Sequence, residues 1–338
     1  MITVFGAAGF IGTYLVDELM REGFGVLATD TSDIGEVYYK ERGISFVDLD
    51  IRKEEDFDYL RETDVEAAIN LACLQPANVA KDEYKPSDYV ATNTIGTLNI
   101  LEFCRKQRVP KVIYTCSHRN TQGLWGDKKP ICEQDGRAIQ FTGEYAMYSI
   151  SESAAADCVQ HYTEAYGIQG IILRLPPVYG YGPHTEIFKD GEPHNTGFKI
   201  FMENASAGKP LEIWGDSQKG RDIIYVKDVV SAIISALKSN EAKGLYNIAS
   251  GKVLTLEDEA RTIAKILSAE SPLPEITFRP DKPNGIESFV YDISKAKRDL
   301  GWSPKYSFEQ MLIDYVKEMK SGRFNFLLEK RRQMLLQK

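Results

Sequence analysis

The 338-residue sequence contains few of the residues that build disulfide frameworks or metal sites. Its five cysteines are dispersed without a Cys-x-x-Cys pair, and its four histidines show no metal-ligand spacing. An odd, scattered set of cysteines is typical of reduced thiols in a cytoplasmic protein. We therefore expect a cytoplasmic protein with no disulfide framework and no metal.

Long apolar runs and excess positive charge are also absent. No apolar stretch approaches the roughly 18 residues needed to cross a membrane, and no basic leader precedes the first predicted strand. The net charge is −8 at pH 7 and the pI is about 5.3, which argues against a nucleic-acid partner. The hydrophobic content of 43% is enough for a real core in one large or two modest domains.

The strongest local signal is a glycine-rich stretch near the N-terminus. Residues 1–5 are typical of a short buried strand, three glycines follow at a spacing of three, and an apolar helical pattern begins at once. A strand, a glycine turn and a helix make the geometry that binds a dinucleotide pyrophosphate. Missing side chains let backbone N–H groups approach the phosphates, and the helix N-terminus adds free donors and a positive dipole end. The predicted phosphate-binding residues are Gly6, Gly9, Phe10, Ile11 and Gly12.

An acidic residue stands at the distance expected for this motif. Residues 24–29 predict a second strand, and Asp30 closes it, 18 residues after Gly12. A carboxylate there accepts hydrogen bonds from the ribose hydroxyls of the cofactor and repels a 2′-phosphate. Because residues 31–33 contain no Arg or Lys, the sequence favours NAD over NADP.

The first half of the chain alternates apolar strands with helical patterns. Repeated βα units with buried strands predict a parallel sheet covered on both faces, with ligands beyond the carboxyl ends of the strands. The predicted fold class is α/β, a Rossmann-type doubly wound parallel sheet. Its NAD-binding domain is expected over residues 1–176, with strands at 1–5, 24–29, 45–49, 67–72, 111–116 and 168–175 and helices at 54–61, 93–106 and 148–166.

The rhythm changes after Pro176. Residues 179–195 are rich in Gly, Pro and His and predict a long loop, after which shorter strands and helices follow. We assign residues 177–320 to a smaller, interleaved mixed α/β domain that binds substrate, and expect parts of 215–250 to return to the first domain. Residues 321–338 predict a C-terminal helical tail that packs on its own body or on a neighbouring subunit.

Short motifs spread along residues 1–318 point to one enzyme group. They are residues 6–12, 50–52, 70–72, 93–99, 178–183, 215–216, 221–229, 246–251 and 292–304. With these motifs the chain resembles the extended short-chain dehydrogenase/reductases, in the branch of NAD-dependent nucleotide-sugar epimerases and dehydratases.

The resemblance implies roles for individual residues. Arg221 is expected to pair with the diphosphate of a nucleotide sugar, for which a guanidinium fork is suited. The alternative for Arg221 is a surface salt bridge to Asp222 or Asp228. The expected cofactor contacts are Asp50 and Ile51 beside the adenine, Leu71, Ala72 and Asn93 in the pocket of the ribose and nicotinamide, and the backbone at Val178 beside the carboxamide.

The resemblance also implies a catalytic group made of a Tyr, a Ser or Thr, and a Lys four residues after the Tyr. Tyr148 matches the Tyr acid/base, Ser117 matches the Ser, and the Lys position is Glu152. A free tyrosine has a pKa of about 10, which a nearby cation lowers and a nearby carboxylate raises. Three hypotheses remain for Glu152: a hydrogen bond to the nicotinamide ribose, a protonated donor, or a solvent-facing side chain in an impaired enzyme.

Further departures from the resembling enzymes concern the substrate. Pro177 stands where an Asn usually precedes Val-Tyr-Gly, and the second diphosphate-binding Arg is missing, with Arg279 as a possible substitute. The acid pair of the 4,6-dehydratases is absent after Ser117, which argues against dehydration. His118 follows instead, and is either an extra acid/base and substrate contact or a loop residue in solvent.

We therefore expect an NAD-dependent nucleotide-sugar epimerase that acts through transient C4 oxidation. The alternative is a catalytically weakened NAD(H)-binding protein with a sensing or scaffold role, which Glu152 and Pro177 favour. The resemblance also implies a homodimer in which the helices at 93–106 and 151–166 pair across a two-fold axis.

Overall fold

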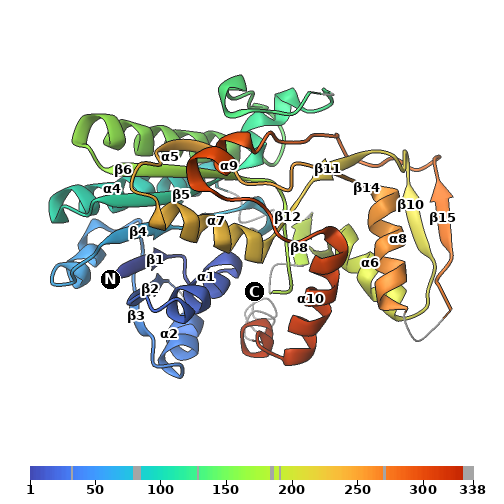
Figure 1. The fold of residues 1–338 in the computed structure, drawn as a ribbon, viewed down its shortest axis with the longest axis horizontal. Coiled ribbons are helices and arrows are strands. Elements are labelled where there is room, and N and C mark those ends of the chain that lie inside the picture. Colours follow the sequence, from blue (N-terminus) through green and yellow to red (C-terminus); the bar gives the residue numbers. More distant parts are fainter. Residues whose placement is uncertain are drawn as a thin grey trace.

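The computed structural model describes residues 1–31, 33–78, 85–127, 129–182, 186–189, 192–268 and 272–329. A large sheet with helices on both faces makes up most of the first half of the chain, and smaller sheets and helices extend from one side of it (Figure 1). Within the described residues, no helix is long and apolar enough to span a bilayer.

The large sheet has seven strands, all parallel, and confirms the predicted fold class. The strand order is β13-β6-β5-β4-β1-β2-β3. The order reverses between β1 and β4, which is where doubly wound sheets bind their ligands. The strands are β1 (Ile2–Phe5), β2 (Val26–Asp30), β3 (Ser45–Asp48), β4 (Ala67–Asn70), β5 (Lys111–Ser117), β6 (Gln169–Leu175) and β13 (Gly244–Asn247).

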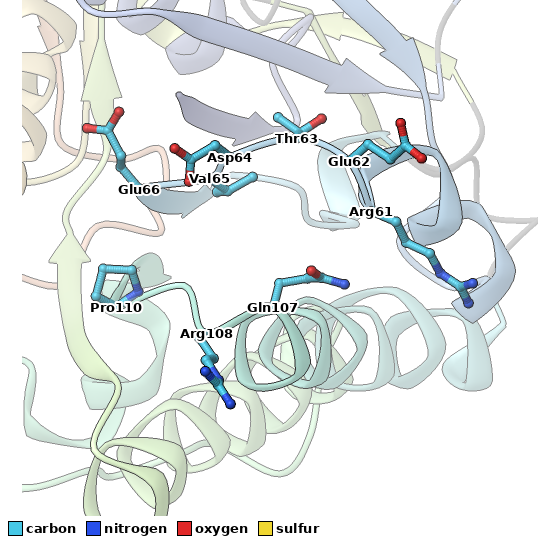
Figure 2. Close-up of a pocket in the computed structure, with 9 residues that line it drawn as sticks. All are labelled: Arg61, Glu62, Thr63, Asp64, Val65, Glu66, Gln107, Arg108 and Pro110. Carbon is cyan, nitrogen blue, oxygen red and sulfur yellow. The ribbon is translucent and has the colours of Figure 1, made fainter.

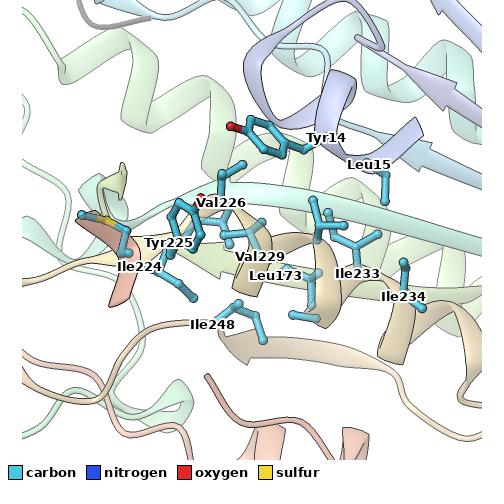
Figure 3. Packing of buried hydrophobic residues seen from close by; sticks show 14 of the residues in the cluster. Tyr14, Leu15, Leu173, Ile224, Tyr225, Val226, Val229, Ile233, Ile234 and Ile248 are labelled. Carbon is cyan, nitrogen blue, oxygen red and sulfur yellow. The ribbon is translucent and has the colours of Figure 1, made fainter. Parts of the chain in front are cut away.

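Successive side chains along the strands are buried in two apolar cores, one on each face of the sheet. Val4 belongs to the core under helices α1 (Phe10–Arg21), α2 (Asp33–Lys40) and α7 (Val226–Lys238), where Leu15 and Ile233 are also buried (Figure 3). Phe5 points the other way, into the core under α4 (Gly96–Gln107) and α5 (Ala146–Tyr166). This period of two with burial on both faces is what a parallel sheet requires.

The remaining elements are short. Side-chain caps begin three of the helices: Thr196 caps α6 (Gly197–Ser206), Thr255 caps α8 (Leu256–Leu267) and Ser307 caps α10 (Phe308–Ser321). The two-stranded sheets pair β10 (Leu211–Trp214) with β15 (Ile276–Arg279), β11 (Gly220–Asp222) with β14 (Val253–Thr255), and β7 (Val178–Tyr179) with β12 (Ile224–Tyr225). The helices are α6 (Gly197–Ser206), α8 (Leu256–Leu267), α9 (Ser294–Leu300) and α10 (Phe308–Ser321), with 3₁₀ turns η1 (Glu54–Leu60), η2 (Pro76–Asn78), η5 (His118–Leu124) and η6 (Glu133–Asp135).

Two predicted segments differ from the structure. The expected loop at 179–195 is wrong, because β7 begins it and an antiparallel hairpin of β8 (Glu186–Lys189) and β9 (Glu192–Asn195) follows. The helix expected at 93–106 begins earlier, as α3 (Pro86–Tyr89) continues through a π-helical segment η4 (Val90–Ile95) into α4. Inserted π turns occur often at functional sites.

The start of the C-terminal tail packs on α1. Phe324 is fully buried, with its ring 5.1 Å from that of Tyr14, and Arg323 forms an ion pair with Asp17. Residues 330–338 of the expected tail lie outside the described residues.

A shallow groove lies at the amino-terminal edge of the sheet (Figure 2). Residues 61–66, which lead into β4, line it together with Gln107, Arg108 and Pro110, which lead into β5. Parallel α/β sheets bind ligands at the opposite, carboxyl edge, so this groove does not mark the candidate site.

The glycine turn after β1 is at the carboxyl edge and is packed against its surroundings. Gly6 has a φ of +78°, and a Cβ atom there would lie 2.7 Å from the backbone nitrogen of Ala72. A Cβ atom at Gly12 would lie 2.4 Å from the Gly6 carbonyl oxygen. These contacts are too short for any side chain, so both positions require glycine.

Gly12→Ala is expected to lower the free energy of unfolding by about 1–3 kcal/mol, because the added methyl group must displace backbone atoms. Chemical denaturation at constant m-value measures the loss. Gly197→Ala is the matched control, since Gly197 begins α6 with no atom within 4 Å of an added Cβ, and it should change stability by less than about 1 kcal/mol. Equal effects of the two substitutions would contradict the packing argument.

Candidate active site

The N-terminus of α1 has the properties of an anion-binding site. Its N-cap residue is Gly9, which has no side chain to cap the helix, and the first turn contains no acidic residue. Asp30, at the end of the neighbouring strand β2, accepts a hydrogen bond from the Ala8 backbone N–H at 3.0 Å. The structure therefore brings Asp30 beside the glycine turn, at a helix N-terminus whose dipole and N–H groups favour a phosphate. This cradle without side chains fits a dinucleotide.

Asp50 and Ile51 lie after β3, at the same edge of the sheet. Arg52 bonds the Asp50 carboxylate through two nitrogens, and the closest contact is 2.6 Å. These hydrogen bonds lower the pKa of Asp50. The Ile51 side chain packs on α4, close enough that a Cβ at Gly96 would lie 2.5 Å from its Cδ1.

Two buried asparagines hold the segment that follows β4, which contains Leu71 and Ala72. The Asn70 Oδ1 accepts from the Ala72 N–H at 3.0 Å. Asn93 bonds both backbone groups of Leu74, at 2.7 and 3.1 Å, and its Nδ2 also donates to the Ser151 Oγ at 3.0 Å. Asn93 was expected to be a cofactor contact, and the structure uses its amide to position the pocket wall.

Ser117 and Tyr148 are neighbours, and Tyr148 also interacts with Cys73 of this segment. Ser117 ends β5 and Tyr148 lies in the first turns of α5, and both are buried. Burial raises the pKa of Tyr148 well above its ordinary value, Glu152 and Cys73 add to this, and a hydrogen bond with Ser117 acts in the opposite direction. The Tyr148 hydroxyl is therefore protonated at neutral pH and can donate to an oxygen bound beside it.

Glu152 lies one helical turn after Tyr148 and points inward, with only 2% of its surface exposed. Its Oε1 accepts a hydrogen bond from the Tyr114 hydroxyl at 3.0 Å. Burial raises the pKa of Glu152 to about 8, although hydrogen bonds from Tyr114 and the Ser117 backbone oppose the shift. The solvent-facing hypothesis is therefore wrong, and the carboxyl group is mostly protonated at neutral pH.

Cys73 is a neighbour of this group that the sequence did not single out. Burial, with a further contribution from Glu152, raises its pKa to about 12. A thiol in this state is not a nucleophile at neutral pH.

The His118 ring packs against two aromatic rings, with centroid distances of 5.5 Å to Trp125 and 5.6 Å to Phe289, which are themselves 4.5 Å apart. Burial, and then the cations Arg119 and Arg221, lower its pKa well below the ordinary value. Its Nδ1 lies 3.2 Å from the Leu175 carbonyl oxygen. The lowered pKa argues against titration of His118 near neutrality, and its ring is half-buried in η5; its contact with substrate stays a prediction.

Arg221 lies in β11 beside two groups from other elements. The Tyr179 hydroxyl donates to the Glu259 Oε1 at 3.0 Å, and both groups interact with Arg221. Burial lowers the pKa of Arg221, but Tyr179 and Glu259 outweigh it and the pKa is raised overall. The expected alternative partners have other roles: Asp222 accepts from the backbone of Ser250 and Asp228 from that of Lys305.

The other predicted site residues lie around or apart from this group. The backbone of Val178, in β7, pairs with β12 directly after β6. Arg279, in β15, is ion-paired with Asp281 at 2.8 Å and Glu212 at 3.4 Å. The structure thus places Arg279 at the β10–β15 sheet and does not join it to Arg221.

Arg119 is a site residue that sequence reasoning missed. It follows Ser117 by two residues and lies in η5, with its guanidinium 3.9 Å from the Tyr145 ring centroid and 5.2 Å from that of Trp125. The available signal was a cation directly after the strand that ends in Ser117.

The sequence profile of the NAD dependent epimerase/dehydratase family matches residues 2–249. The chain belongs to this family. A relative from Methanocaldococcus jannaschii, called a putative UDP-glucose 4-epimerase, is 29% identical and covers 95% of this chain and 99% of its own length. A UDP-glucuronic acid decarboxylase of Arabidopsis thaliana is 26% identical over 96% of this chain and 71% of that protein.

Solved structures of the family share the fold. A UDP-glucose 4-epimerase from Thermotoga maritima, determined with UDP-glucose, has a TM-score of 0.78, 27% identity, and covers 95% of this chain and 98% of its own. An epimerase of the same name from Thermus thermophilus, in complex with NAD, has a TM-score of 0.72 and 25% identity, with 94% and 98% covered.

Glu152→Gln tests the buried, protonated carboxyl group through the pH dependence of stability. Because the pKa of Glu152 is higher in the folded protein than unfolded, the protein loses stability as the pH rises from about 4.5 to about 8. The slope is up to about 1.4 kcal/mol per pH unit. Glu152→Gln should remove this loss in urea titrations between pH 5 and 8. Glu55→Gln, at an exposed position, is the control, and identical slopes in both variants would refute the assignment.

Proposed function

We propose that this protein is an NAD-dependent nucleotide-sugar epimerase that acts at C4 of the sugar. The observation that supports this most is the meeting of Ser117 and Tyr148 at the carboxyl edge of the sheet, beside the segment that the Gly6 turn contacts. A phenol that can lose and regain a proton, beside a hydroxyl that hydrogen-bonds the same substrate oxygen, is the pair of groups needed to move an alcohol proton.

The residues that would hold NAD are those of the glycine turn and its neighbours. The α1 N-terminus would bind the pyrophosphate, Asp30 the adenosine ribose, and Leu71, Ala72 and the backbone at Val178 the nicotinamide end. When bound, NAD would accept the C4 hydride of the sugar and return it to the opposite face of the 4-keto intermediate.

Residues of the chain itself would bind the sugar nucleotide and transfer the C4 hydroxyl proton. Ser117 would orient the C4 oxygen. Because Tyr148 is protonated at rest, it would first release its proton to solvent, and the phenolate would then take the C4 hydroxyl proton during oxidation and return it during reduction. Arg221, whose charge is stabilised by Tyr179 and Glu259, would bind the diphosphate through its guanidinium donors. Because Arg221 is half-buried, water would screen its attraction to the diphosphate less than at an exposed arginine.

A second function is favoured by one observation. We take Glu152 to stand in place of the family's Lys, so no cation from α5 stabilises a Tyr148 phenolate. With burial raising the Tyr148 pKa, the protein would bind NAD(H) without rapid turnover and would act as a sensor or scaffold.

Turnover with matched UDP-, GDP- and dTDP-sugars separates the two functions. The epimerase should interconvert one C4 pair, and Tyr148→Phe should reduce that rate by about 10²–10⁴-fold with NAD binding retained. Tyr162→Phe is the control, because Tyr162 lies on the same helix with its hydroxyl bonded to Glu102. Retained NAD binding with no turnover on any sugar would favour the sensor or scaffold.

Glu152→Lys should raise the rate of sugar oxidation and move the rising limb of the pH–rate profile to lower pH, because a cation lowers the pKa of Tyr148, which must be deprotonated to take the sugar proton. Glu152→Gln is the isosteric control and should leave the profile near pH 7 unchanged, since it replaces one neutral group by another. Stopped-flow absorbance of NADH reports the oxidation step. Identical profiles for the Lys and Gln variants would show that charge at residue 152 does not control Tyr148.

A further inference from the structure

Arg119 is a half-buried cation that lacks an acidic partner. Within the described ranges, no carboxylate is paired with its guanidinium, whose side-chain hydrogen bond goes to the Gln122 Oε1 at 3.3 Å. Burial lowers the pKa of Arg119, as does the nearby Arg221, while the phenols of Tyr145 and Tyr148 oppose the shift. An unpaired, partly desolvated charge beside a second guanidinium is costly, and a bound anion would offset that cost.

The guanidinium is also fixed in place. The Tyr145 ring lies 3.9 Å and the Trp125 ring 5.2 Å from its central carbon. Aromatic contact of this kind holds the planar group while leaving its N–H edges available to a carboxylate or phosphate. The site is therefore preorganised for an anion.

The position of Arg119 distinguishes it from Arg221. Arg119 follows Ser117 by only two residues and interacts with Tyr148, so it lies at the reacting end of the site. Arg221 has Glu259 and Tyr179 as partners and is farther along the chain, in β11. Two neighbouring cations that come from different elements favour a ligand with more than one anionic group.

We propose that Arg119 binds a carboxylate on the sugar itself, so that the substrate is a nucleotide-linked hexuronic acid. This rests on the proposed function, in which Tyr148 and Ser117 hold the C4 oxygen. The C6 carboxylate of a hexuronic acid is two bonds from C4, so it lies next to the oxygen that Tyr148 contacts. The Arg119 guanidinium then forms a bidentate ion pair with that carboxylate, whereas a neutral hexose offers it no anionic partner.

The test compares an acidic and a neutral sugar carried by the same nucleotide, in one pair of UDP-sugars and one pair of GDP-sugars. Calorimetry of the NAD-saturated protein with UDP-glucuronate, UDP-glucose, GDP-mannuronate and GDP-mannose should show one acidic sugar binding at least roughly tenfold tighter than its neutral counterpart. Arg119→Gln should abolish that difference and leave the affinity for the neutral sugar within about threefold. Arg119→Lys should restore part of it. Arg137→Gln, at an arginine paired with Asp157, is the control and should keep the wild-type pattern.

Other outcomes overturn the proposal in distinguishable ways. An equal loss with acidic and neutral sugars would place the diphosphate on Arg119. A shift of the pH–rate profile for a neutral sugar in Arg119→Gln, with no change in the acidic preference, would make Arg119 a positioning cation for Tyr148. Binding of none of the four sugars, with NAD still bound, would instead refute the nucleotide-sugar function.

Discussion

The contact between the glycine turn and the segment after β4 is the constraint on which the rest of the site depends. Gly6 can meet the Ala72 backbone only because it has no side chain and a positive φ. Asn70 and Asn93 fix the other side of that segment. Asn93 then bonds Ser151, whose hydroxyl donates to the Tyr148 carbonyl at 3.0 Å. The turn that would hold the cofactor and the tyrosine that would serve it are thus linked by buried hydrogen bonds, which resist small displacements.

Burial decides the charge of almost every group in the site. It keeps His118 neutral and raises the pKa values of Glu152 and Tyr148, so the described neighbours of Ser117 carry no negative charge at neutral pH. Arg119 and Arg221 keep their charge because a guanidinium is protonated even when its pKa is lowered. The reacting end of the site is therefore positive, which suits an anionic ligand.

The sequence predicted the features that depend on local pattern. Gly6, Gly12 and Asp30 could be located because a tight turn and a strand end impose their residue types within one βα unit. The β8–β9 hairpin was missed because Gly, Pro and His are typical of loops, and strand pairing there depends on contacts that no local pattern encodes. The hydrogen bond of Tyr114 to the buried Glu152 joins residues that are 38 apart in the sequence. The electrostatic interaction of Arg221 with Glu259 also joins distant residues, so only the structure could show these two neighbours.

The neutral state of Glu152 changes how its effect on Tyr148 should be judged. The sequence suggested a carboxylate that repels a phenolate, but repulsion requires an ionised Glu152, and its pKa of about 8 leaves it mostly protonated at pH 7. The two groups titrate as a coupled pair, so a phenolate at Tyr148 would itself hold the proton on Glu152. Glu152 therefore does not repel a phenolate at Tyr148 strongly, but it supplies no positive charge to stabilise one. Tyr148 would then have to work against the cost of burial, because no cation at position 152 lowers its pKa.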